Sequence, residues 1–271
     1  MQYTEILIFI IAGLVGGFMA GMLGVGGGII FVPVLQQVLI HFKITDQVVA
    51  YTLANSLAIV FCVGISGSYK QLKLKNTHVP SALVTGSAAI VSSLTLTFIF
   101  NYFKLDYPIV FKIIFATILI VTAVRMFLEV KKKSVETGPV HLPERRAFIP
   151  AGLFAGVVTS LSGLGGGIVM VPYFSKVLKL PIRFATGLSL SVIPVIAFPL
   201  LLFYSLQEPS QFLYSNLQTG FLVWPVILPI IAGAMLASQW GIKVAQRLQS
   251  QTLKVIFLIF ILLNLMKLIL T

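Results

Sequence analysis

Ten apolar segments, joined by short polar or basic stretches, run the length of this 271-residue chain. Most are close to twenty residues long, the length that a helix needs to cross a hydrocarbon core of about 30 Å. Only 10% of the residues are charged, whereas a water-facing surface normally needs about a quarter. The pattern therefore predicts an all-α integral membrane protein. The expected segments are residues 5–24, 27–40, 48–68, 79–101, 108–128, 148–165, 167–178, 184–206, 217–240 and 252–270.

A glycine-rich motif occurs twice. Residues 12–35, AGLVGGFMAGMLGVGGGIIFVPVL, align without a gap on 151–174, AGLFAGVVTSLSGLGGGIVMVPYF, and eleven of these twenty-four positions are identical. After a contraction of four residues the similarity continues weakly, with 50–61 aligned on 185–196. The repeat predicts two related membrane units, residues 1–128 and 148–271, joined by the basic linker 129–147. Each unit is expected to hold a broken helix pair followed by three transmembrane helices.

The charges of the loops predict how the halves are oriented. Lys and Arg number three in 69–78, five in 129–147, three in 175–183 and two in 241–251. These loops are expected in the cytoplasm, with both termini outside and the protein in the plasma membrane. The loop assignments hold together only if each broken pair enters and leaves on one side, so that the second half is inverted. Each pair is either a full hairpin or a re-entrant excursion, which gives eight to ten membrane segments.

The two short segments, 27–40 and 167–178, directly follow the glycine clusters. Glycine reaches positive φ, so such a cluster can end one helix and present the free N–H groups of the next. Helix starts attract anions, and inverted repeats with interrupted helices are typical of secondary transporters. A purely structural turn is the alternative. The expected substrate-binding residues at the breaks are Gly24, Gly26, Gly27, Gly28, Ser160, Ser162, Gly163, Gly165, Gly166 and Gly167.

Other small and polar residues follow helical spacing. Gly13, Gly17, Gly21, Gly152 and Gly156 have the spacing of tight helix packing, and we assign them that role. A polar stripe in the spans after the breaks supplies hydroxyl and amide donors, which serve either an oxyanion or hydrogen bonds between helices. Its members are Thr52, Asn55, Ser56, Ser189 and Ser191, and Gln239 and Trp240 are weaker candidates.

The titratable residues limit the chemistry. All seven acidic residues and all three histidines fall in loops or at segment ends, and Cys62 is the one cysteine. We therefore expect no catalytic residue, metal or cofactor, and passive or potential-driven movement of an anion, with proton antiport through backbone and water as the alternative. An anion channel and a transporter of an unrelated small solute remain alternatives. The expected partners are a small anion and the lipid bilayer; a homodimer is left open, and nucleic acid is not expected despite a net charge of +12.

The paired motif resembles that of a known family. The pattern GxxxGxLGVGGGxIxVP near the N-terminus, its return in the second half and the basic central loop are similar to the TauE/SafE, or sulfite exporter, family of membrane transporters. The resemblance covers both halves. It implies export or exchange of small sulfur-containing anions such as sulfite, thiosulfate or sulfonates, among them sulfoacetate. Distant thiosulfate importers of this superfamily use several cysteines, so a cysteine relay is not expected in this chain.

Overall fold

The computed structural model describes residues 3–44, 46–103, 108–130, 142–210, 212–213 and 217–248, with part of the stretch 251–266. Eight of its helices begin within two residues of a predicted segment, and the described residues of the last predicted segment are helical. The helices are α1 (Tyr3–Leu23), α2 (Gly28–His41), α3 (Val48–Lys73), α4 (Val79–Tyr102), α5 (Pro108–Val130), η1 (Arg145–Phe148), α6 (Ile149–Ser162), α7 (Gly167–Pro172), the π-helical turn η2 (Tyr173–Val177), α8 (Ile182–Ser205) and α9 (Trp224–Arg247).

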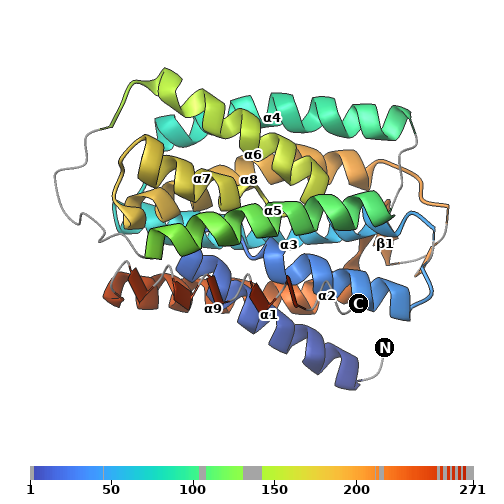
Figure 1. The fold of residues 1–271 in the computed structure, drawn as a ribbon. Helices are drawn as coiled ribbons and strands as arrows, with labels where there is room; N and C mark the ends of the chain where they lie inside the picture. Colours follow the sequence, from blue (N-terminus) through green and yellow to red (C-terminus); the bar gives the residue numbers. More distant parts are fainter. Residues whose placement is uncertain are drawn as a thin grey trace.

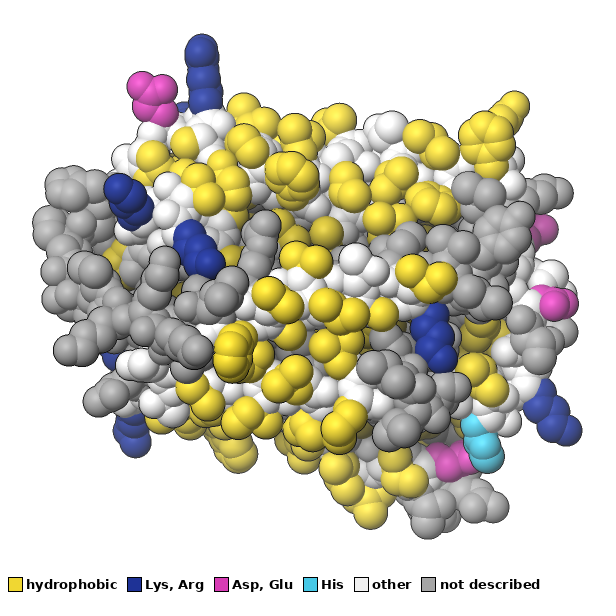
Figure 2. All heavy atoms as spheres, viewed as in Figure 1, with side chains coloured by type: hydrophobic (Ala, Val, Ile, Leu, Met, Phe, Trp, Pro, Cys, Tyr) yellow, Lys and Arg dark blue, Asp and Glu magenta, His cyan; other side chains and the backbone are white. Residues whose placement is uncertain are grey.

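The surface is that of a protein immersed in lipid. Five helices, α1, α3, α4, α8 and α9, are long and apolar enough to cross a membrane. Large apolar side chains such as Phe98, Phe154 and Leu236 are exposed. Their exposure to water would be unfavourable, whereas their contact with lipid hydrocarbon is not. Figure 2 shows hydrophobic side chains across the middle of one face and charged side chains toward its two ends. The chain is a multi-pass helical membrane protein, as its sequence predicts.

The segment expected at 217–240 begins differently from its prediction. Residues 218–223 form a hairpin of two short antiparallel strands, β1 (Gln218–Thr219) and β2 (Leu222–Val223), joined through Gly220 at φ 56°. Helix α9 starts only at Trp224, with a proline in its first turn, where the missing N–H costs nothing. The prediction of helix from residue 217 was wrong because the apolar run through the hairpin reads as one continuous segment.

Glycines let the first helix of each half pack closely on a helix of the other half. A Cβ atom at these glycines would overlap a backbone carbonyl of the partner helix, which confirms the predicted packing role. Along each pair the contact residues rise in number together in both helices, so the two helices run parallel. Figure 1 shows α1 beside α9 and α6 beside α4. The pairs are Gly13–Ile230, Gly17–Ala234 and Gly21–Ser238 between α1 and α9, and Gly152–Thr85 and Gly156–Ala89 between α6 and α4.

The central helices α3 and α8 occupy corresponding places in the two halves and run antiparallel. Gly64 of α3 lies against Pro194 of α8, and Gly67, one turn later, lies against Leu190, one turn earlier. Two inverted repeats would make this arrangement. Because α1 and α6 each pack on the opposite half, the halves share one hydrophobic core. The unit boundaries at 128 and 148 stay a prediction, and residues 131–141 of the expected linker lie outside the described chain.

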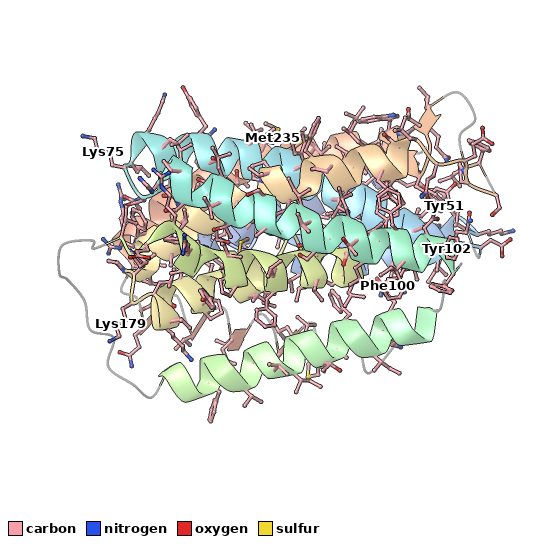
Figure 3. The ribbon with its side chains drawn as sticks, turned by 90° about the horizontal axis from the view of Figure 1, so that it is seen from above. Tyr51, Lys75, Phe100, Tyr102, Lys179 and Met235 are labelled. Atoms are coloured by element: carbon pink, nitrogen blue, oxygen red, sulfur yellow. The ribbon has the colours of Figure 1, made fainter. Side chains whose placement is uncertain are left out.

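The two ends of the molecule differ as the loop charges predict. In Figure 3, Lys75 and Lys179, from two loops expected in the cytoplasm, lie at one end of the bundle. Tyr51 and Tyr102 lie at the opposite end. Helix α5 crosses in front of the other helices in Figure 1 and lies along one edge of the bundle in Figure 3, so it is on the outside. The orientation of these ends in the bilayer stays a prediction, and below we call the end that holds Tyr51 the outer end.

Candidate functional site at the glycine breaks

The two glycine clusters interrupt their helices with the same backbone course. Helix α1 ends at Leu23 and α2 begins at Gly28, while α6 ends at Ser162 and α7 begins at Gly167. Three glycines in each break have positive φ, a conformation that side chains disfavour. The predicted helix breaks are thus present in both halves. The equivalent pairs are Gly24 and Gly163 (73° and 67°), Gly26 and Gly165 (78° and 74°), and Gly27 and Gly166 (80° and 72°).

The two breaks lie against each other at the centre of the core. A Cβ atom on Gly28 would fall 2.6 Å from the Cα atom of Leu164 in the opposite break. The counterpart contact repeats this distance, since a Cβ atom on Gly167 would fall 2.6 Å from the Cα atom of Val25. Residues 24–28 and 163–167 are all buried. The structure therefore brings together every glycine predicted to bind substrate.

One apolar side chain from each central helix covers the middle glycines of both breaks. A Cβ atom on Gly26 would meet Ile193 of α8 at 3.0 Å and Val60 of α3 at 3.1 Å. The same two side chains face Gly165, at 2.6 Å for Val60 and 3.4 Å for Ile193. Both Val60 and Ile193 are fully buried. They close the space in front of the breaks in this conformation.

Two buried serines tie each break to the central helix of the other half. Ser56 of α3 donates a hydrogen bond of 2.9 Å to the carbonyl oxygen of Gly163, and Ser189 of α8 donates one of 2.8 Å to that of Gly24. A hydroxyl has one proton, so neither serine can donate to an anion while it holds a carbonyl. In this conformation the two serines position the breaks.

These hydrogen bonds also correct the expected alignment of the halves. Ser56 and Ser189, like Val60 and Ile193, are 133 residues apart, whereas the paired break residues Gly24 and Gly163 are 139 apart. The contraction between the repeats is therefore six residues and not four. The residue equivalent to Ser56 is Ser189, and not Ser191 as the expected alignment implies. Weak sequence similarity over twelve residues does not determine how one helix aligns with the other, whereas the hydrogen bonds of the two serines do.

The other predicted ligands use their protons within the protein. Thr52, Ser160 and Ser162 each donate to a carbonyl of their own helix, at 2.7, 2.9 and 2.5 Å. Ser191 lies apart from the breaks, where it donates to Gly187 and accepts from Ser68 and Thr77. Gln239 donates to Ser66 at 3.3 Å, and Trp240 is 65% exposed on the apolar surface.

Asn55 holds a partner that sequence reasoning did not foresee. Its side-chain nitrogen donates to the carbonyl oxygens of Tyr51 (2.7 Å) and Phe221 (2.9 Å), and its oxygen accepts from the amide of Val223 (2.9 Å). The last two partners belong to the hairpin 218–223. Gly220 and the proline after Trp224 are sequence signals that could have indicated this turn.

Peptide groups supply the electrostatics of the breaks. Helices α2 and α7 begin at the breaks, where the first N–H groups have no partner within the helix and carry a positive partial charge. The buried polar side chains of the described chain are all neutral hydroxyls and amides. N–H groups of this kind are the groups that hold small anions at helix starts, and the breaks that present them are buried.

The serine ties give a direct prediction. Ser56→Ala leaves the carbonyl of Gly163 without its donor, so we expect a loss of about 1–3 kcal/mol in unfolding free energy. Ser189→Ala should lose a similar amount, because it holds the equivalent carbonyl. Thermal unfolding in detergent measures both. Ser87→Ala is the matched control, since that exposed serine donates only within α4 and should change little. Equal stabilities of the four proteins would contradict the positioning role.

A pair of buried helix breaks inside a multi-pass bundle is the arrangement of a membrane transporter, since irregular backbone at membrane depth is tolerated only where it is buried or lines a cavity. The chain belongs to the sulfite exporter TauE/SafE family, whose sequence model matches residues 9–268.

Several named relatives resemble the chain over nearly its whole length. A probable membrane transporter protein of Methanocaldococcus jannaschii is 27% identical over 248 residues, which is 92% of this chain and 89% of the relative. One of Haemophilus influenzae is 27% identical over 263 residues, 96% of each chain. The probable membrane transporter protein YunE of Bacillus subtilis is 22% identical over 270 residues, 95% of this chain and 94% of the relative. No solved structure matches the chain significantly.

Proposed function

We propose that this membrane transporter exports small sulfur-containing anions across the plasma membrane by alternating access at the paired glycine breaks. The substrate class is sulfite, thiosulfate or an organosulfonate such as sulfoacetate, and the protein is not an enzyme. The family and the names of the relatives support transport, and the family's name supports the sulfur anions. The observation that carries the site is the close approach of Gly28 to Leu164 and of Gly167 to Val25, which places the start of each short helix against the opposite break.

The strength of such a site follows from its geometry. One helix start stabilises an anion by about 0.3–1 kcal/mol, and by up to about 2 kcal/mol where it is partly buried. Two starts in adjoining breaks could therefore bind an anion weakly without a buried lysine. Weak binding suits a transporter, which must also release its substrate. Because Val60 and Ile193 cover Gly26 and Gly165, binding requires these two side chains to move aside.

The driving force follows from the charge of the substrate. An anion that leaves a cell with a negative interior gains about 2.3 kcal/mol per charge for each 100 mV. The buried polar side chains of the described chain are neutral, so they supply no carboxylate relay for protons or sodium ions. Lysines at the end that holds Lys75 and Lys179 attract anions from the cytoplasm. These features favour export driven by the membrane potential.

An anion channel would use the same backbone groups. The side chains of Val60 and Ile193 favour a carrier, because they lie against both Gly26 and Gly165 and must move before an anion reaches these glycines. Saturable counterflow of a labelled anion between proteoliposomes and medium is expected. Single-channel current steps in a planar bilayer would instead indicate a pore.

Ligand-induced stabilisation of the purified protein tests the substrate class. A ligand at 100 times its Kd raises the free energy of unfolding by about 2.7 kcal/mol. For a chain of this length, that raises the melting temperature by roughly 5–10 °C. We expect this rise with one anion among sulfite, thiosulfate and sulfoacetate, and less with sulfate, phosphate, acetate and taurine.

Two variants connect the stabilisation to the breaks. Gly26→Ala places a methyl group against Val60 and Ile193, and the rise should fall below about 1 °C. Gly67→Ala is the matched control, because its methyl group would meet only the end of the Leu190 side chain, at 3.2 Å. Equal stabilisation of both variants would place the anion elsewhere, and a flat response to every anion would contradict the substrate class.

A further inference from the structure

The hairpin 218–223 lies over the outer end of α3. In Figure 3 Tyr51, in the first turn of that helix, lies at the end opposite Lys75 and Lys179. The hydroxyl of Tyr51 accepts a hydrogen bond of 2.7 Å from Gln218, and Asn55, one turn further along α3, bonds the backbone of Phe221 and Val223. These bonds attach both strands of the hairpin to one helix.

The hairpin also reaches α8. Phe221, 2% exposed, packs its ring edge-on between two tyrosines, with centroid distances of 5.0 Å to Tyr51 of α3 and 6.2 Å to Tyr204 of α8. Its backbone amide donates to the carbonyl oxygen of Tyr204 at 3.2 Å. The hairpin therefore bridges the two central helices at their outer ends. These same helices carry Ser56 and Ser189, which hold the breaks.

The hairpin depends on these contacts for its position. Each strand has two residues, and an isolated two-stranded hairpin is at best marginally stable. Asn55 supplies two of the hydrogen bonds, is fully buried and adjoins Ser56 in sequence. Release of the hairpin would leave the carbonyl of Phe221, the amide of Val223 and the side-chain oxygen of Asn55 without these partners unless water enters, while the Asn55 nitrogen keeps its bond to Tyr51. Opening of the hairpin therefore requires water to reach Asn55, which lies on α3, the helix whose Ser56 positions the second break.

We propose that the hairpin 218–223 is the gate over the outer end of the transport path, and that Asn55 is the positioning residue that holds it closed. The inference rests on the proposed transport function, and it adds which part of the protein opens the transport path to the outside. The sequence predicts Asn55 as a ligand of the substrate; the gate assigns its amide to the protein itself. Phe221 then fills the outer end of the space between α3 and α8 whenever the gate is shut.

The test measures access to the hairpin from outside. Leu222, which is 2% exposed in β2, is changed by Leu222→Cys in a Cys62→Ser background, so that the chain holds a single thiol as the reporter. Intact cells are treated with a membrane-impermeant maleimide, and the labelling rate is followed. Asn55→Ala removes two bonds to the hairpin, so labelling should become about 10- to 100-fold faster.

Matched variants separate the gate from a general loosening of the protein. Thr52→Val removes a buried hydroxyl of α3 that donates only to Val48 in the same helix, and labelling should keep its rate. Tyr51→Phe removes one bond to Gln218 and should give an intermediate rate, which also serves if Asn55→Ala does not fold. An unchanged rate in Asn55→Ala and Tyr51→Phe, or an equal acceleration by Thr52→Val, would overturn the gate.

The experiment distinguishes the side from which the hairpin is reached, and its outcome is independent of the substrate. Labelling from the cytoplasmic face of inverted vesicles should be slower than from outside, and the reverse result would overturn the outer gate. The labelling assay contains no anion, so its outcome does not depend on the substrate class. Faster labelling in Asn55→Ala, together with no movement of any sulfur anion, would uphold the gate and contradict the proposed function.

Discussion

Replacing Gly28 with alanine should strongly reduce the rate of transport, although alanine is the better helix former. Gly28 is the first residue of α2 and its φ is not positive, so local propensity favours alanine by about 1 kcal/mol. Its new methyl group, however, would lie 2.6 Å from the Cα atom of Leu164 and 3.0 Å from the carbonyl oxygen of Gly163. Both are backbone atoms, which cannot rotate away, so the breaks must separate.

The expected size follows from overpacking, which costs about 1–3 kcal/mol in a packed core. A transport site that needs the two breaks in contact should lose about 5- to 150-fold in rate, because each 1.4 kcal/mol is a factor of ten. Anion efflux from proteoliposomes, normalised to the amount of inserted protein, measures the loss. Gly167→Ala should behave alike, since its methyl group would meet the Cα atom of Val25 at the same distance.

Gly67→Ala is again the suitable control, because it adds a methyl group to a buried helix without approaching a backbone atom. It should keep most of the efflux rate. If Gly28→Ala and Gly167→Ala transported at the rate of the unmodified protein, the contact between the breaks would have no part in transport. If only one of them failed, the two breaks would not be equivalent in function.

Gly17→Leu should prevent a stable assembly of the bundle. A Cβ atom at Gly17 would overlap the carbonyl oxygen of Ala234, so α1 and α9 would have to move apart along the whole contact that Gly13 and Gly21 continue. Helices in lipid associate mainly by close packing, and a large residue at this position removes it. We expect a loss above about 3 kcal/mol, at the severe end for single substitutions.

Size-exclusion profiles and thermal unfolding in detergent measure this loss. Val15→Leu is the matched control, because this residue of the same helix is 53% exposed on the apolar surface. Its profile should be that of the unmodified protein. Gly156→Leu should repeat the defect, since Gly156 lies equally close to Ala89 of α4. A stable Gly17→Leu protein would show that the α1–α9 contact is dispensable.

Much of the fold is predictable because its signals are local. Apolar length places the helices, and dense glycines mark the two breaks, where positive φ at Gly24 and Gly163 confirms the interruption. The same clusters hold most of the candidate site. What these glycines bind stays a prediction, because the contacts show only that the breaks meet.

The hydrogen-bond partners were not predictable, because they depend on which groups the fold places opposite one another. Asn55 and Ser56 are neighbours in sequence, yet one holds the hairpin and the other holds the second break. The expected alignment makes Ser191 the equivalent of Ser56, whereas the hydrogen bonds show that the equivalent residue is Ser189. A polar stripe indicates buried donors and leaves their acceptors open.

The pairing of α1 with α9 also has a consequence for biosynthesis. Helix α4 is complete before α6 leaves the ribosome, so that parallel pair can form as soon as α6 is inserted. Helix α1 is made before the other described helices, and α9 begins roughly 200 residues after α1 ends, which takes roughly 10–40 s at about 5–20 residues per second. Through that interval the glycine face of α1 has no helix of its own chain to pack against as in the finished bundle. Helix α1, the earliest of the described helices to be made, is therefore among the last to be secured.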